Sequence, residues 1–296
     1  MDTVLSGQLL FSALVIGAVY ALTGLGLNLV YGTMRLLNIA HGDVVMLGAY
    51  LAFWLFSLGQ ISPLLAAPLA VLGAAGLGAL AYLGLFRRQI ETTPAVEKLE
   101  ANSLLLFFGI SVVIQNLASL AFTPSPRAVT YLDTIYRLGG VSMTGNRLAI
   151  LGISVLICVA TALVLRYSVY GLAIKALIQN REAAAVVGVN VRRVQIVSLM
   201  LGFGLAGLAG TLLSMTEQIS PFMGFPFTIA AFVVIIMGGL GNLVGGILAG
   251  FLLGFVEIYG VVLTSSNARS IILYGVFVGV LLLRPQGLLG GRRISQ

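Results

Sequence analysis

Residues 243–263 read LVGGILAGFLLGFVEIYGVVL, and this stretch decides the fold class of the chain. Its length matches the roughly 20 apolar residues that a helix needs to cross the hydrocarbon core of a bilayer. Glu257 is the only ionisable side chain other than Tyr259 in the stretch. Gly246, Gly250 and Gly254 recur at every fourth position, a spacing that lets two helix backbones approach closely in lipid. The stretch therefore predicts a membrane-spanning helix that packs against a neighbour.

Further apolar runs divide the rest of the chain, and we expect each to form a helix. They cover residues 9–31, 44–58, 63–86, 104–122, 148–165, 195–216, 227–237 and 270–283. The runs 44–58 and 227–237 are short for a crossing, so the sequence predicts eight transmembrane helices, or nine if both cross. No linker or low-complexity segment marks a boundary. We therefore expect an all-α polytopic membrane protein with one domain over residues 1–296.

The composition excludes other classes of protein. Of 296 residues, 59% are hydrophobic and 8% are charged, against roughly 45–50% and about 25% in soluble domains. So few charges could not cover the surface of a soluble fold or keep a disordered chain in solution. The continuous apolar runs also differ from the alternating strands of an outer-membrane barrel.

The positive charges predict an orientation in the membrane. The chain has 16 Lys and Arg against 9 Asp and Glu, a net charge of +7. Many of the positive side chains lie in the connections 87–102 and 166–194 and in the C-terminal tail from Arg284 onward. Basic connections stay in the cytoplasm, so we expect the C-terminus inside and the N-terminus outside. The connection 123–147, with three arginines, would then be an exception. The charge indicates orientation and no nucleic-acid partner.

Catalytic side chains are scarce in this sequence. His41 is the only histidine and Cys158 the only cysteine, so no metal site of the His and Cys type can form. A phosphate-binding P-loop needs a lysine after a glycine, but Lys98 follows Glu97 and Lys175 follows Ile174. We expect no enzyme activity and no bound cofactor or metal. Any ATP would be hydrolysed by another polypeptide.

Polar residues interrupt the apolar pattern between the first two runs, at Asn38, His41 and Asp43. Asp43 precedes Val44 and could cap the helix that starts there. Alternatively, the three side chains line a polar break beside a translocation pathway, since irregular backbone at membrane depth survives only against protein or water.

Two further polar features lie near the C-terminal end of the chain. Residues 238–242, which include Gly239 and Asn242, can form either a tight turn between helices or a broken helix beside a substrate path. Glu257 is costly in lipid if ionised, so we expect it to face the bundle interior. There it would contact either substrate or a neighbouring helix.

A short helix is predicted between two spans, at residues 180–188. Asn180 is a suitable N-cap, Glu182 favours the first turn, and Gly188 provides a C-terminal stop. A helix of about two turns does not persist alone in water. It must pack on this chain's own surface or on a cytoplasmic partner.

At these residues the sequence resembles the permease subunits of ATP-binding-cassette (ABC) importers. Glu182-Ala183-Ala184, followed by Gly188, is similar to the core of the loop that such permeases dock onto their ATPases, although the Leu-Pro that often follows the core is absent. Three other stretches resemble the branched-chain amino-acid (LIV-type) branch of the family: Asn38 to Asp43 with Met46 to Tyr50, Gly238 to Gly241, and Leu283 to Leu288.

The resemblance implies a bacterial inner-membrane importer with the ABC permease fold. Two permease subunits would form the pathway, two ATPase subunits would use ATP, and a periplasmic binding protein would deliver a small amino acid. Members of the family also carry urea and amides. The loop 167–194 would couple to the ATPase through residues Asn180, Arg181, Glu182, Ala183, Ala184, Gly188 and Asn190.

Two other functions remain open from the residues alone. A stand-alone secondary transporter or channel could use Asp43, Glu217 and Glu257 as ion or proton sites. An intramembrane enzyme acting on lipid would need His41 and Asp43 as an acid–base pair.

Overall fold

The computed structural model describes residues 6–93, 95–138, 140–265, 268–283 and 287. The tail arginines and most of the predicted C-terminal motif 283–288 lie outside these residues. The first five helices of the chain are α1 (Gly7–Met34), α2 (His41–Gly59), α3 (Pro63–Ala81), α4 (Arg87–Thr92) and α5 (Val96–Phe122). The others are α6 (Gly145–Tyr167), α7 (Val169–Gln179), α8 (Arg181–Val186), α9 (Val191–Leu213), α10 (Gly224–Gly238), α11 (Leu243–Leu263) and α12 (Arg269–Leu283).

The helices confirm a polytopic helical membrane protein. Within the described residues, seven helices are long and apolar enough to cross a bilayer, with α3 and α4 counted as one continuous helix over Pro63–Thr92. α10 and α12 have 15 residues each, or about 22 Å at 1.5 Å per residue, which is less than the hydrocarbon core. The eight or nine predicted crossings correspond to these seven helices together with α10 and α12.

Several segments differ from the expectation. The run 63–86 was expected to end before Arg87, but a π-helical turn (η1, Tyr82–Phe86) leads directly into α4. α5 likewise begins at Val96 instead of Leu104. The charged residues there are good helix formers, and Arg87 forms an i,i+4 ion pair with Glu91 at 3.3 Å. The connection 123–147, expected as a loop, contains a hairpin of β1 (Ile135–Leu138) and β2 (Val141–Thr144), so the described fold is not wholly α-helical.

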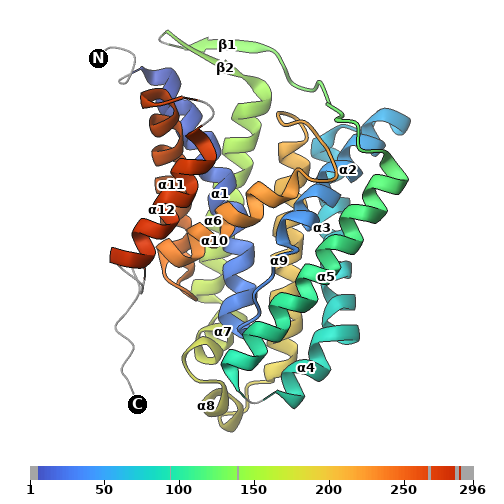
Figure 1. Cartoon of the computed structure of the whole chain (residues 1–296), viewed down its shortest axis with the longest axis vertical. Coiled ribbons are helices and arrows are strands. Elements are labelled where there is room, and N and C mark those ends of the chain that lie inside the picture. The colour runs from blue at the N-terminus through green and yellow to red at the C-terminus, as the bar shows by residue number, and fades with distance from the viewer. Residues whose placement is uncertain (1–5, 94, 139, 266–267, 284–286, 288–296) are drawn as a thin grey trace.

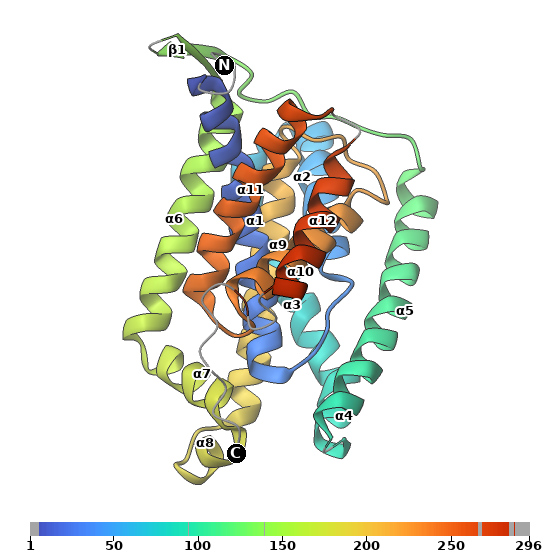
Figure 2. The ribbon, with the colours of Figure 1, turned by 60° about the vertical axis from the view of Figure 1, so that its left-hand side comes forward.

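The bundle has two distinct ends. The hairpin and the start of α1 lie at one end, and α4, α7 and α8 lie at the other (Figure 1). α1 and α9 run through the middle, whereas α5 stands to one side in the turned view (Figure 2). The basic connections that include α4 and α7–α8 therefore share one end of the molecule, as the charge pattern predicts.

The contact between α1 and α11 depends on glycine. A methyl group added at Gly250 would lie 2.4 Å from the backbone nitrogen of Ala21, and one added at Gly254 would lie 2.4 Å from that of Gly17. Such distances leave no room for any side chain. The predicted glycine face of residues 243–263 is confirmed, and its partner is α1, most of whose residues are buried.

We predict that Gly250→Ala lowers the stability of the folded protein, because overpacking of a tight contact costs about 1–3 kcal/mol. Gly73→Ala is the matched control, since Gly73 is exposed on α3 and a methyl group there meets no atom within 4 Å. Melting temperatures in detergent, measured by size-exclusion chromatography after heating, test this. Equal melting temperatures for the two variants would show that the backbones are not packed as described.

Candidate functional site

The connection between α1 and α2 is buried, irregular backbone. It rises alongside α1 toward the start of α2 (Figures 1 and 2). Three helices hold it by hydrogen bonds: Ser103 of α5 accepts from the Leu37 backbone N–H at 3.0 Å, and Thr228 of α10 donates to the Ile39 carbonyl at 3.1 Å. The His41 Nε2 lies 3.0 Å from the Thr23 carbonyl of α1. Side chains of the neighbouring helices thus form hydrogen bonds with backbone groups of this segment, which lipid could not provide.

The predicted cap at Asp43 is wrong. α2 begins at His41, three residues earlier than expected, and its N-cap residue Ala40 has no side-chain cap. Gly42 in this first turn approaches α10 closely, since a methyl group there would clash with the Gly224 carbonyl oxygen. The Asp43 Oδ1 instead accepts a hydrogen bond from Gln115 Nε2 of α5 at 2.9 Å.

Several polar atoms in this region have no partner among the described residues. They are both amide atoms of Asn38, the Nδ1 of His41 and the Oδ2 of Asp43, all buried. Buried polar groups without hydrogen bonds are uncommon and call for a reason. Asn38 precedes α2, and His41 and Asp43 lie in its first turn. His41 and Asp43 bind different partners and do not pair with each other.

Residues 238–242 form a tight turn between α10 and α11. Gly239 and Gly241 have φ of 96° and 83°, which a residue with a side chain rarely adopts. Asn242 is the N-cap of α11 and accepts from the Gly245 N–H at 2.9 Å. Asn28 of α1 binds both sides of the turn: it accepts from the Gly241 N–H at 2.8 Å and donates to the Asn242 carbonyl at 2.9 Å.

Glu257 faces the bundle interior, as predicted. Its side chain is 2% exposed and forms an ion pair with Arg269 Nε at 2.5 Å, while the Tyr20 hydroxyl donates to its other oxygen. Neither partner was predicted from the sequence. Arg269 lies one residue before the run 270–283 and is the basic residue closest in sequence to the helix that carries Glu257. This proximity could have indicated it as the partner.

The predicted short helix is present as α8. Asn180 caps it by accepting from the Ala183 N–H at 2.9 Å, and Gly188 ends it with φ of 89°. Asn190 caps the following helix, accepting from the Arg193 N–H at 3.0 Å. α8 presents Arg181, Glu182, Ala183 and Val186 to the outside, with Val186 87% exposed, whereas Ala184 is buried.

α7, which was expected as part of a loop, links α8 to the interior. Its Ile178 side chain lies against Gly32 near the end of α1 and against Gly241 in the α10–α11 turn. Methyl groups at these two glycines would lie 3.1 and 3.0 Å from Ile178. α7 therefore connects the exposed α8 with α1 and with the turn that carries Gly239 and Asn242.

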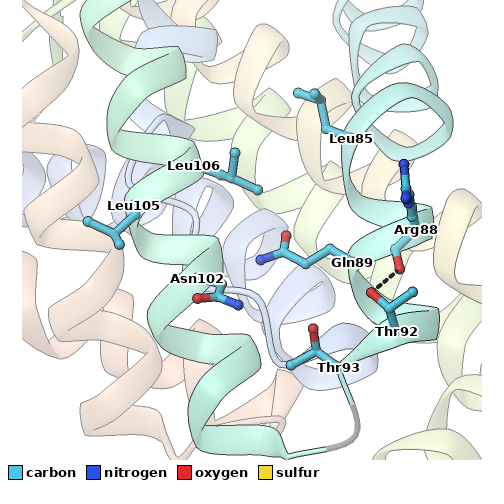
Figure 3. A pocket seen from close by; sticks show the side chains of 8 residues that line it. All are labelled: Leu85, Arg88, Gln89, Thr92, Thr93, Asn102, Leu105 and Leu106. Atoms are coloured by element: carbon cyan, nitrogen blue, oxygen red, sulfur yellow. Dashed lines mark hydrogen bonds between the residues drawn. The ribbon is translucent and has the colours of Figure 1, made fainter.

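Two cavities mark the described part of the chain. The larger, of about 500 Å³, lies between α4 and α5, where Gln89 reaches toward Asn102 (Figure 3). Arg88 is the only charged side chain in its wall. The smaller, of about 320 Å³, lies between α1, the α9–α10 connection and α12, and both Glu217 and Arg269 line it. None of the described residues form a cluster of His, Cys, Asp and Glu that could hold a metal ion.

Comparisons with known proteins agree on one family. The family model described as "Branched-chain amino acid transport system / permease component" matches residues 9–283. The high-affinity branched-chain amino acid transport system permease protein BraD of Pseudomonas aeruginosa is 30% identical over 98% of this chain and 97% of its own length. The corresponding protein LivH of Escherichia coli K12 is 28% identical, with the same coverage. LivM of that organism is 28% identical over 92% of this chain and 68% of its own length. No solved structure matches.

We predict that Asn28→Ala destabilises the protein, because it leaves two backbone groups of the α10–α11 turn without partners. Each buried group left unsatisfied costs about 1–3 kcal/mol. Asn116→Ala is the control, since Asn116 is exposed on α5 and its side chain bonds only within its own helix. Thermal unfolding in detergent compares the two. If Asn28→Ala lowers the unfolding temperature no more than Asn116→Ala does, the assigned role of Asn28 is contradicted.

Proposed function

The chain belongs to the family of branched-chain amino-acid transport permease components, and on that premise we propose how it works as the membrane-spanning subunit of an ABC importer. It would lie in the inner membrane with α8 toward the cytoplasm and the N-terminus toward the periplasm. Two ATPase subunits would bind at the α8 end and use ATP, and a periplasmic binding protein would deliver the solute at the hairpin end. No enzyme activity or cofactor of its own is needed.

The observation that carries the proposal is the exposed α8. This helix of six residues is capped at both ends by its own sequence, yet it keeps Val186 and Val187 in the open. Val186 and Val187 are neighbouring apolar side chains at the end of the bundle that carries the basic connections (Figure 1), and they provide a surface on which another protein can pack. We assign that contact to the ATPase, through Asn180, Arg181, Glu182, Ala183, Ala184 and Gly188. Asn190 contributes by starting α9.

The names of the similar proteins support the substrate and a second permease. BraD and LivH are described as branched-chain amino-acid permeases, and LivM is a second kind of such permease that also matches this chain. We therefore propose that this chain carries branched-chain amino acids and pairs with a different permease subunit. Urea or amides would be carried only if the binding protein delivered them.

The packing suggests how movement at α8 would reach the pathway. ATP-driven closure of the motor would displace α8, and α7 would pass the displacement through Ile178 to α1 and the α10–α11 turn. A tightly packed interior shifts between discrete arrangements rather than deforming smoothly. The turn with Gly239 and Asn242, the break with Asn38, His41 and Asp43, and the buried Glu257 all contact or adjoin α1. These residues are our proposed pathway elements.

Uptake by proteoliposomes tests the function. Vesicles would contain this chain, the second permease and the ATPases, with binding protein and tritiated leucine outside and ATP sealed inside. We expect leucine uptake with ATP and none with a non-hydrolysable analogue. Uptake by this chain alone, driven by a proton or sodium gradient, would overturn the proposal and favour a secondary transporter that uses Asp43, Glu217 or Glu257.

We predict that Val186→Asp uncouples the importer. A buried, unpaired carboxylate at the ATPase contact should lower uptake at least tenfold, which corresponds to about 1.4 kcal/mol, and should reduce the ATPase that copurifies with the permease. Insertion in the membrane should not change. Ile135→Asp, at an exposed position of the hairpin at the other end, is the control for copurification, which it should leave at the parental level. Parental uptake and copurification for Val186→Asp would show that α8 is not the docking helix.

A further inference from the structure

The cavity of about 320 Å³ between α1, the α9–α10 connection and α12 has the chemistry of a site for a zwitterion. The connection lies in the half of the bundle that carries the hairpin, away from α8 (Figures 1 and 2). One carboxylate, Glu217, and one guanidinium, Arg269, line the cavity together with apolar side chains. Its volume falls within the range of small-molecule sites, roughly 300–1,000 Å³.

Arg269 presents unused hydrogen-bond donors. Its Nε donates to Glu257, and one terminal nitrogen lies 3.5 Å from the Tyr20 hydroxyl. A guanidinium carries five N–H donors, so these contacts leave others free, and its side chain is 44% exposed. The buried Glu257 fixes the group in place. An anchored guanidinium with free donors is suited to bind a carboxylate.

Glu217 presents its carboxylate to the same cavity. Its side chain makes no hydrogen bond or ion pair with any residue that the structure describes. Its segment is nevertheless held in place, because Arg127 and Ile219 exchange two backbone hydrogen bonds of 2.9 and 2.7 Å. A fixed carboxylate without a partner, partly withdrawn from solvent, favours a cation such as an ammonium group.

The remaining wall is partly polar, with Gln218, Ser220 and Ser270, and partly apolar. Met223, Phe227 and Leu273 line the cavity and are each less than 10% exposed. Aliphatic and aromatic side chains of this kind provide the apolar surface that an aliphatic ligand group would bury. The larger cavity between α4 and α5 lacks this set, since it has a cation but no carboxylate.

We propose that this cavity binds the α-amino acid itself, with Arg269 on its carboxylate, Glu217 on its ammonium group and the apolar part of the wall on its side chain. This inference rests on the proposed function and deepens it, because it places selection for a zwitterion within the permease. A neutral solute such as urea would make no charge-assisted hydrogen bond with Glu217 or with the free donors of Arg269. The cavity therefore favours a zwitterion over neutral solutes.

Competition binding to the purified complete transporter, without binding protein, tests the assignment. Tritiated leucine is competed with leucine, with 4-methylpentanoate, which lacks the ammonium group, and with 3-methylbutylamine, which lacks the carboxylate. Loss of one charge-assisted contact lowers affinity by about ten- to a hundredfold. Glu217→Gln should lower the affinity for leucine by this factor and leave the affinity for 4-methylpentanoate unchanged. Arg269→Lys should lower the affinities for leucine and 4-methylpentanoate but leave the affinity for 3-methylbutylamine unchanged.

Asp133→Asn is the matched control, since it removes an exposed carboxylate near the hairpin that does not line the cavity. It should not change any affinity. Glu217→Gln is decisive even if Arg269→Lys fails to fold, because no described contact depends on the Glu217 side chain. Unchanged leucine affinity in Glu217→Gln, or no saturable leucine binding to a transporter that imports leucine with ATP, would overturn the site alone. A complex that imports no amino acid would overturn the proposed function as well.

Discussion

The close packing of α1 against α11 is the constraint on which the rest of this structure depends. In lipid, burial of apolar surface cannot hold helices together, so backbone approach and polar contacts must do so. Gly250 and Gly254 meet α1 at distances that exclude any side chain. That approach brings Tyr20 to Glu257 and Asn28 to the α10–α11 turn. One helix contact therefore positions two polar clusters, one at the middle of α1 and one about two turns closer to its C-terminal end.

The polar interior follows from the same requirement that lipid imposes on every backbone group. The α1–α2 connection and the α10–α11 turn are irregular, and each is held by side chains from neighbouring helices. Thr228 serves the first, and Asn28 serves the second. Such segments can rearrange more readily than a helix, because their hydrogen bonds are few and specific. They lie between the exposed α8 and the cavity lined by Glu217 and Arg269, where a transporter needs its moving parts.

Local chemistry explains which features could be predicted from the sequence. The apolar run 243–263 coincides with α11, and Asn180 caps α8 as its position before Glu182 suggests. Tertiary contacts explain the failures. α2 starts before Asp43, and Gly42 in its first turn packs on Gly224, a contact that no local pattern reveals. The pairing of Glu257 with Arg269 depends likewise on how α11 and α12 meet beside α1. The hairpin was missed because its strands have four residues each.

In the proposed mechanism, ATP-driven movement of the ATPase enters this chain through α8. A photoreactive probe attached at Ala185→Cys, in a Cys158→Ser background that removes the only native cysteine, tests this contact in the assembled transporter. The account predicts a covalent adduct with the ATPase subunit after illumination, and none from the same probe at Ile135→Cys on the hairpin. An active, ATP-driven complex in which the α8 probe labels only lipid or this chain itself would contradict it.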